Sequence, residues 1–357
     1  MRVLFCDDSI QRDTVAYQQA WERHEVPAQA LYGALQLPEN GIELQIMDYR
    51  KKKRFSSRVV AALCTTHQIY RATRKCDAVF SNSIRGLEGL MILRRLHLFS
   101  KPIFVWQHTA FQPNDKTISN KVKTWILKGI DEMFFFNQQI ADEAIKTGKV
   151  GKYKVIPYGA DMQFYSKSKK GCVGSHVTFL STGIENRDYE TLLNAFKNQS
   201  SELDIYAFPS NNGIDYMKIL NQAHESNIHI HILKEPLPSV QLREITTSSD
   251  CIVISTLPLP YIYPCGLTSI VEAMALGKPI IATYNPWYGI DIEKEGIGFI
   301  AKSSEDWEKI IGEISRNPQQ LAQMGEKAYQ LAVKKYNIQN TGRMVAHEIL
   351  STLENTK

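Results

Sequence analysis

The sequence predicts an α/β protein in which two doubly wound, Rossmann-like sheets face each other across a central cleft. Three observations lead to this fold class. The chain has 357 residues, more than twice the length of a typical domain. Short β-rich runs alternate with longer helical patterns along the whole chain. The alternation restarts near residue 177, after a polar stretch that has no apolar period.

Six short apolar runs in the first half are the expected strands of one sheet. They are Arg2–Cys6, Glu43–Met47, Ala78–Ser81, Pro102–Gln107, Glu132–Phe136 and Lys154–Pro157. Helical patterns separate them, which is typical of parallel strands joined by crossover helices. We therefore expect a first domain over residues 1–162.

The second half repeats this organisation after a linker expected at 161–175. Its expected strands are Val177–Ser181, Asp204–Ala207, Ile228–Ile232, Cys251–Ser255, Pro279–Ala282 and Gly298–Ile300. They predict a second domain over 176–335. Two helices are expected between Pro318 and Asn355, and the last of them, within 336–357, is expected to return to the first domain.

Composition limits the class of protein. Hydrophobic residues make up 43% and charged residues 22%, as in ordinary globular proteins. No apolar stretch reaches the roughly 18–20 residues of a membrane span, and the first ten residues lack the pattern of a secretory signal. The six cysteines form no C-x-x-C pair, so reduced thiols are expected. These features predict a cytoplasmic protein.

The net charge of +5 is unevenly distributed. Residues 1–160 carry 24 Lys and Arg against 15 Asp and Glu, whereas the remainder has an acidic excess. The stretch Arg50–Lys75 contains no acidic residue. Arg50–Arg58 with Phe55, and Trp125 with Lys121, Lys123 and Lys128, would suit an anionic surface on the inner face of the plasma membrane. A solvated basic face is the alternative.

The segment 263–283, YPCGLTSIVEAMALGKPIIAT, carries the strongest local signal for chemistry. Gly266 is expected to open a mostly apolar helix that Gly277 ends. A helix N-terminus opened by glycine presents free N–H groups and about half a positive charge, which suits a phosphate. Glu272 lies one turn beyond, where a carboxylate can accept hydrogen bonds from a pair of sugar hydroxyls. A capped core helix without a ligand is the alternative.

Within this segment, GLTSIVEAMALGKPIIAT resembles the donor-binding segment of GT-B glycosyltransferases, in particular the nucleotide-sugar-dependent family 4. VIPYGAD at 155–161 is similar to that family's IPNGVD, and STGIENRDYETLLNAF at 181–196 is similar to its phosphate loop. The three segments follow the family's order and spacing. The resemblance implies a donor held mainly by the second domain, an acceptor held mainly by the first, and transfer that retains the anomeric configuration.

The resemblance also implies roles for individual residues. Glu272 would bind the donor ribose, Arg187 would pair with the diphosphate, and Gly183 would let its loop approach closely. Leu237 lies in 233–245, which resembles the loop that holds the nucleobase. The expected donor-binding set is Gly183, Arg187, Leu237, Cys265, Gly266, Leu267, Thr268 and Glu272. For Arg187, capping a helix or pairing with Glu190 is the alternative.

The sequence departs from the family pattern at three positions. Pro264 stands eight residues before Glu272, where the family has a first Glu that usually contacts the sugar. Gly266 stands six rather than five residues before Glu272. Ile184 occupies a position where many relatives have Arg, which leaves Arg187 as the cation of the phosphate loop.

Three residues of the first half lie where a ligand would bind. His108 follows the expected strand 102–107, and ligands of doubly wound sheets bind at the carboxyl ends of strands. It resembles the family's His that touches the donor sugar, so His108 and Arg187 are the expected catalytic residues. Asp7 and Asp8 follow the first strand, and either would orient an acceptor hydroxyl or cap a helix.

These features together predict a hexosyltransferase of cell-surface polysaccharide, lipopolysaccharide or glycolipid assembly. The expected partners are a nucleotide sugar, UDP-linked rather than GDP-linked, a saccharide or lipid-linked acceptor, and an anionic membrane surface, but no nucleic acid. No cofactor is expected, and no metal, because D-x-D and metal-ligand spacings are missing. Two rival functions stay open: a non-catalytic GT-B scaffold subunit and a GT-B nucleotide-sugar epimerase.

Overall fold

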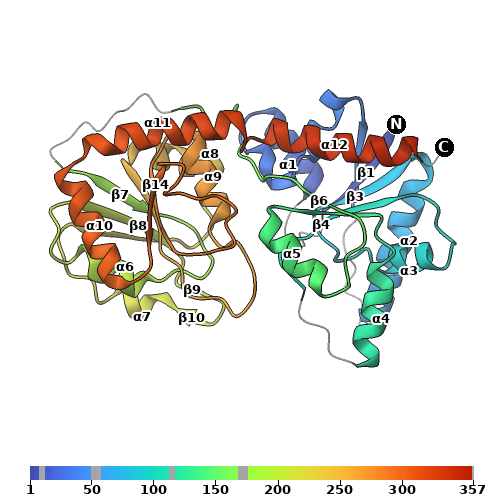
Figure 1. Ribbon diagram of the computed structural model, residues 1–357, viewed down its shortest axis with the longest axis horizontal. Coiled ribbons are helices and arrows are strands. Elements are labelled where there is room, and N and C mark those ends of the chain that lie inside the picture. Colours follow the sequence, from blue (N-terminus) through green and yellow to red (C-terminus); the bar gives the residue numbers. More distant parts are fainter. Residues whose placement is uncertain (8–12, 50–57, 112–116, 168–175, 356–357) are drawn as a thin grey trace.

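The structure, a computed structural model, describes residues 1–7, 13–49, 58–111, 117–167 and 176–355. Two six-stranded parallel sheets lie side by side along the long axis, each with helices on both faces (Figure 1). The expected α/β architecture of two doubly wound sheets is confirmed.

The first sheet has the order β2-β1-β3-β4-β5-β6. Its strands are β1 Arg2–Cys6, β2 Glu43–Ile46, β3 Ala78–Ser81, β4 Ile103–Trp106, β5 Glu132–Phe135 and β6 Tyr153–Val155. In β1, Val3 and Phe5 face one hydrophobic cluster while Leu4 and Cys6 face another, and all four are buried. This burial on both faces explains why the run is continuously apolar.

The helices of the first domain connect these strands. They are α1 Thr14–Glu22, α2 Arg58–Ala72, α3 Glu88–Arg95, α4 Ile118–Leu127 and α5 Gln138–Lys146, with short 3-10 turns η1 Ala28–Leu31, η2 Ala34–Gln36, η3 Pro38–Asn40 and η4 Thr73–Lys75. Side chains of Asp13, Thr117 and Asn137 accept hydrogen bonds from backbone N–H groups in the first turns of α1, α4 and α5. These caps fix where the helices begin.

The second sheet has the order β11-β8-β7-β12-β13-β14. Its strands are β7 Thr178–Ser181, β8 Glu202–Ala207, β11 Ile228–Ile232, β12 Cys251–Ile254, β13 Ile280–Thr283 and β14 Gly298–Ala301. A small hairpin, β9 Ser210–Asn211 and β10 Ile214–Asp215, follows β8. The helices are α6 Tyr189–Phe196, α7 Tyr216–Leu220, α8 Ser239–Ser248, α9 Leu267–Ala275, α10 Ser304–Arg316 and α11 Gln319–Lys334.

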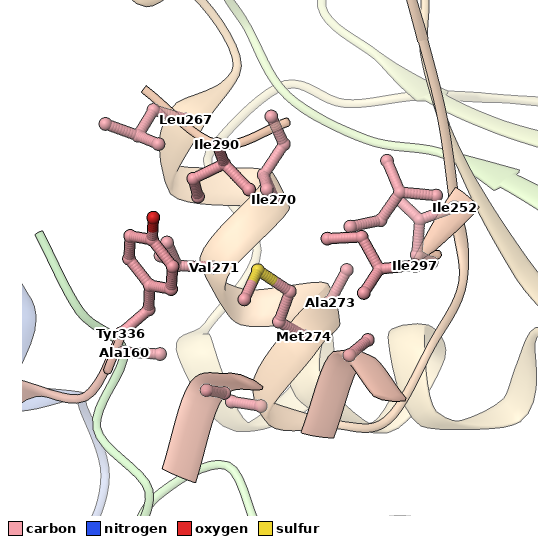
Figure 2. Packing of buried hydrophobic residues seen from close by; sticks show 14 of the residues in the cluster. Ala160, Ile252, Leu267, Ile270, Val271, Ala273, Met274, Ile290, Ile297 and Tyr336 are labelled. Atoms are coloured by element: carbon pink, nitrogen blue, oxygen red, sulfur yellow. The ribbon is translucent and has the colours of Figure 1, made fainter. Parts of the chain in front are cut away.

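Helix α9 lies in the middle of a hydrophobic cluster on one face of the second sheet (Figure 2). Ile270, Val271 and Met274 are fully buried there. At the end of α9, Gly325 of α11 approaches so closely that a Cβ on it would lie 2.2 Å from the Gly277 carbonyl oxygen. This packing fixes the position of α9, and therefore of its N-terminus.

The last helix, α12 Ile338–Glu354, crosses from the second sheet to the first (Figure 1). Ile338, Val345, Ala346, Ile349 and Leu353 of α12 belong to the hydrophobic cluster that contains Val3 and Phe5. The crossing lies beside the earlier connection, because the Ala160 N–H donates to the Tyr336 carbonyl at 3.0 Å and the Ile338 N–H donates to the Ala160 carbonyl at 2.8 Å. Two segments of chain therefore join the sheets side by side.

The connection expected as a polar linker at 161–175 contains buried aromatic residues in its described part. Phe164 and Tyr165 are 2% and 3% exposed and belong to the cluster around α9. Asp161 is also buried, and its carboxylate accepts hydrogen bonds from the backbone N–H groups of Ala28, Gln163 and Phe164. This part of the connection is packed between the two sheets.

Candidate functional site

A cavity of about 300 Å³ lies between the two domains, at the carboxyl ends of strands from both sheets. The first domain and the connection contribute Tyr32, His108, Phe136 and Tyr158. The second domain contributes Thr182, Gly183, Ile184, Glu185, Arg187, Leu242, Tyr263, Pro264, Gly266, Leu267, Thr268, Ser269 and Glu272. Carboxyl ends of parallel strands are where doubly wound proteins bind their ligands.

The N-terminus of α9 opens into this cavity. Gly266, its N-cap, has φ +96°, and no side chain of the described residues caps the helix. A Cβ on residue 266 would lie 2.7 Å from the Ile254 side chain, so both the conformation and the space require glycine. The expected helix opening is therefore present: the Leu267 N–H donates to the Pro264 carbonyl at 3.0 Å, and the next residues of the first turn, Thr268 and Ser269, line the cavity.

Arg187 lies beside this helix N-terminus and is only 3% exposed. Its Nε and Nη2 donate to the Thr182 carbonyl at 3.2 and 2.9 Å, and Nη2 also lies 3.5 Å from Ser269 Oγ. Its Nη1 is buried and has no hydrogen-bond partner in the described part of the chain. A Cβ on Gly266 would lie 3.9 Å from Nη1. A buried guanidinium N–H without a partner indicates a place for an anion.

Gly183 leaves room for this guanidinium. Its φ is +109°, and a Cβ there would lie 1.9 Å from Arg187 Nη2. The alternatives for Arg187, capping a helix or pairing with Glu190, do not describe its contacts: Asp188 caps α6, and the guanidinium donates to Thr182.

Glu272 lies one turn into α9, at the boundary between the domains. Its Oε1 accepts hydrogen bonds from Gln29 Nε2 at 3.0 Å and from the Tyr165 hydroxyl at 2.8 Å. Burial raises the pKa of the carboxyl to about 7, and the two hydrogen bonds oppose this shift. The carboxylate is thus fixed in direction by a residue of the first domain and one of the connection.

Gln29 links this carboxylate to the connection between the domains. Its side-chain oxygen accepts from the Asp161 N–H at 3.0 Å, and its side-chain nitrogen donates to Glu272. The side chain is 1% exposed. Gln29 therefore bridges helix α9 and the connection between the domains.

His108 follows β4 and lines the cavity from the first domain, as the sequence predicts. Its ring stacks on Tyr32 with centroids 4.9 Å apart and lies 5.2 Å from the ring of Phe136. Tyr32 has a left-handed backbone with φ +53°. These aromatic contacts hold the imidazole at the cavity wall, opposite α9.

Other expected site residues lie elsewhere. Asp7 is buried, and its carboxylate accepts from Asn82 at 2.6 Å and from the Thr14 hydroxyl at 3.2 Å, while Asp8 lies outside the described residues. A second cavity lies next to this one. Leu237 lines neither of the two cavities, whereas Leu242 of α8 lines the first. Cys265 lines the neighbouring cavity, and its thiol donates to the Glu185 carbonyl at 3.6 Å.

Sequence reasoning missed Gln29, Tyr32, Tyr158 and Tyr165 as site residues. Tyr158 lies within VIPYGAD, which the resemblance already singled out, so that motif offered a signal. Gln29 and Tyr32 lie in a short 3-10 region that carries no motif, and Gln29 meets Glu272 across 243 positions of sequence. Contacts over such separations arise only from the fold.

Residues 1–7, 13–49, 58–111, 117–167 and 176–355 contain no group of three or more His, Cys, Asp or Glu side chains placed to hold a metal ion. Within the same residues, no helix has both the length and the apolar character needed to cross a membrane.

Comparisons with known proteins place the fold. No family model matches the sequence, and no curated protein sequence matches it. Among solved structures, sucrose-phosphate synthase from Thermosynechococcus elongatus has a TM-score of 0.69 at 12% identity and covers 100% of this chain and 99% of its own. Anabaena HepE in complex with UDP has a TM-score of 0.67 at 16% identity over 98% and 100%.

A third structure is WaaG, described as a glycosyltransferase involved in lipopolysaccharide biosynthesis. It has a TM-score of 0.61 at 12% identity and covers 98% of this chain and 99% of its own. At such identities the likeness concerns architecture alone. The chain has the GT-B fold over its full length.

Proposed function

We propose that this chain is a glycosyltransferase that moves a sugar from a nucleoside diphosphate donor to an acceptor hydroxyl. The observation that carries the proposal is Nη1 of Arg187, buried without a hydrogen-bond partner among the described residues and placed beside the glycine-opened N-terminus of α9. Leaving a buried charged donor unpaired costs more than pairing it. A diphosphate in the cavity would accept from Nη1 and from the N–H groups of Thr268 and Ser269 in the first turn of α9.

The remaining lining residues fit the other parts of such a donor. Glu272, held by Gln29 and Tyr165, offers a carboxylate to the ribose hydroxyls. His108 lies on the opposite wall, in the first domain, where the transferred sugar would lie between the two domains. The donor therefore touches both domains, and binding it favours the closed arrangement in which water is excluded.

The reaction then rests on positioning and on stabilising the departing diphosphate. The bond from the anomeric carbon to the phosphate oxygen breaks, and a bond to the acceptor oxygen forms. The acceptor proton goes to the leaving phosphate. In the proposed retaining course the acceptor attacks from the face that the diphosphate leaves, so no protein nucleophile and no metal are required. The configuration of the product, read by NMR, and turnover in excess chelator test these two points.

The proposed donor is a UDP-sugar, because the HepE structures with a similar fold contain UDP and UDP-glucose. The proposed setting is assembly of a cell-surface polysaccharide, lipopolysaccharide or glycolipid, in line with the description of WaaG. We place the protein in the cytoplasm and, as a peripheral protein, on the anionic inner face of the membrane. Of the two basic segments behind that placement, 50–57 lies outside the described residues and α4 lies within them.

Thermal-shift measurements with UDP, GDP, ADP and CMP test the donor site. At 100 times its Kd, a ligand stabilises by about 2.7 kcal/mol, which is a shift of several degrees. We expect UDP to shift the wild type and to lose most of its effect on Arg187→Ala, because the diphosphate loses its fixed guanidinium.

Arg94→Ala is the matched control. Arg94 is also a partly buried arginine, and it donates to Asp131 at 2.5 Å and to the Ser100 carbonyl, far from the cavity. Its loss should lower the melting temperature without reducing the UDP shift. If Arg187→Ala responds to UDP like the wild type, the diphosphate site is wrong.

The scaffold alternative is favoured by one observation, that Pro264 and Ile184 line the cavity where relatives carry charged residues. A chain that binds UDP but releases no UDP from any UDP-sugar, with or without acceptor sugars, would establish that alternative and overturn the catalytic proposal.

A further inference from the structure

A second cavity, of about 400 Å³, opens at the carboxyl ends of β12, β13 and β14. Its walls come from three loops, 256–265, 283–287 and 301–304, and from the first turns of α6 and α10. Five aromatic side chains line it: Tyr261, Tyr263, Tyr284, Trp287 and Trp307. A cavity of this size with mostly apolar walls and a few polar groups is the usual form of a small-ligand site.

The second cavity shares a wall with the first. Tyr263 lines both, and its ring lies 6.2 Å from that of Tyr261. The Tyr263 carbonyl accepts from Asn285 Nδ2 at 3.1 Å, which ties this wall to the loop after β13. A ligand in the second cavity would therefore lie one side chain away from the proposed donor.

The charges around the second cavity disfavour a phosphate. Two helix N-termini lie there, but Asp188 caps α6 and Ser303 caps α10 by accepting backbone N–H groups. The first turn of α10 also carries Glu305 and Asp306. Among the described residues that line the cavity, Lys302 is the one cation, and its ammonium lies 6.0 Å from the centroid of the Tyr284 ring. The site thus suits a neutral ligand.

The exposed aromatic rings indicate what kind of neutral ligand fits. Tyr261 and Tyr284 are 42% and 57% exposed, so their faces are open to a bound molecule. Aromatic faces are negative, and the C–H groups of a sugar ring are weakly positive, so the two stack. The hydroxyls of Tyr261, Tyr284 and Ser304 can exchange hydrogen bonds with sugar hydroxyls.

We propose that the second cavity is a subsite for a neutral saccharide, namely the acceptor sugar unit next to the one that receives the transferred sugar. This inference rests on the proposed function for its link to transfer. The acceptor would then contact both domains: its receiving sugar unit lies against the first domain, as the resemblance implies, and Tyr284 holds the preceding unit on the far side of Tyr263.

Isothermal titration with maltotriose, cellotriose, mannotriose and N-acetylchitotriose tests the subsite. The variant is Tyr284→Ala, and the matched control is Tyr70→Ala, another exposed tyrosine at 39%, located on α2 of the first domain. We expect at least one trisaccharide to bind the wild type and Tyr70→Ala equally. Its Kd should rise about three- to tenfold in Tyr284→Ala because a stacking face is lost. The UDP thermal shift should be the same in all three proteins.

Two results would overturn the subsite: no trisaccharide binds the wild type, or Tyr284→Ala binds as tightly as the wild type. A different result would show that the proposed function is wrong while the subsite is right. A trisaccharide that depends on Tyr284, in a chain that UDP does not stabilise, would keep the saccharide assignment and remove its role in transfer.

Discussion

At the scale of single residues, Glu272 is a buried acidic side chain of the site with a raised pKa. Both hydrogen bonds that it receives fall on the same carboxylate oxygen, and burial raises its pKa to about 7. Its charge therefore changes within the neutral range, where an unperturbed glutamate is fully ionised. Stability and donor binding should both respond to pH through this one group.

We expect the stability difference between the wild type and Glu272→Gln to depend on pH. The pKa of about 7 in the folded protein lies above the ordinary 4.5, so the folded state binds the proton more tightly. The wild type therefore loses stability as the pH rises from about 4.5 to about 7, and the glutamine variant lacks this loss. Thermal unfolding near pH 5 and near pH 8 should show that the stability of the variant, relative to that of the wild type, is greater at the higher pH.

Tyr165→Phe provides the comparison for this prediction. It removes one of the two hydrogen bonds that hold the pKa of Glu272 down, so the loss of stability should extend to higher pH. An unchanged difference between wild type and Glu272→Gln at the two pH values would contradict the assignment.

The sequence could predict only those site residues whose role depends on the local segment in which they lie. Gly266, Arg187 and Glu272 lie in motifs whose local chemistry is visible in the sequence, and the structure brings all three to one cavity. Gln29 and Tyr165 act on Glu272 from distant segments, and no local pattern marks them. Leu237 stays a prediction, because the resemblance implies that its loop holds the nucleobase through main-chain groups.

At the scale of elements, helix α4 has an exposed apolar side. Ile118, Val122 and Trp125 are 79%, 50% and 37% exposed. Their spacing of four and three residues places them on one face of the helix. Lys121 lies on the same helix and Lys128 directly follows it, and Arg95 lies over the Trp125 ring with 5.5 Å to its centroid. An apolar stripe with flanking cations is the pattern of a helix that lies on an anionic membrane.

We expect the full chain to co-sediment with vesicles that contain phosphatidylserine and not with purely phosphatidylcholine vesicles. The double variant Val122→Asp with Trp125→Ala should lose most of this binding, because it removes inserted apolar area and adds a repelled charge. Lys309→Glu, an exposed change on α10, is the control for charge alone. Equal binding to both kinds of vesicle, or to neither, would rule out the membrane proposal.

Most elements could be predicted from the sequence because their faces are buried. The strands β1, β3 and β11 have the bounds that the apolar runs predict, and other strands differ by one or two residues at their ends. The hairpin of β9 and β10 was missed because its strands have two residues each. Its signal was the Asn212-Gly213 turn, in which both residues have positive φ.

At the scale of the whole molecule, Gln29 of the first domain contacts helix α9 of the second domain. That side chain holds Glu272 with its nitrogen and the Asp161 backbone with its oxygen. Separating the domains would break the bond to Glu272, whereas the bond to Asp161 joins the first domain to the connection. If Glu272 holds the donor as proposed, donor binding and the arrangement of the domains would be coupled through the Gln29 amide.

We expect Gln29→Leu to weaken UDP binding about tenfold, because Glu272 loses the hydrogen bond that Gln29 donates to it and can turn away from the ribose. The matched control is Gln18→Leu on α1, whose side chain donates to Glu22 on the surface. Titration calorimetry with UDP compares the three proteins. Equal affinity in Gln29→Leu and the wild type would contradict the coupling.

The division into two sheets was predictable because each sheet has its own run of strands in sequence order. The way in which the sheets are held together was less visible. Phe164 and Tyr165 are buried in a stretch that reads as polar linker, since two aromatic residues without a period give no signal of burial.

Helix α12 completes the hydrophobic core of the first domain only late in synthesis of the chain. Residues 338–353 leave the ribosome after the whole second sheet, yet they cover part of the face of the first sheet on which Val3 and Phe5 lie. Until then the nascent first domain keeps apolar surface open to solvent, while the second can fold as it emerges. Chaperones that shield nascent chains would therefore be needed mainly by the half of the protein that is made first.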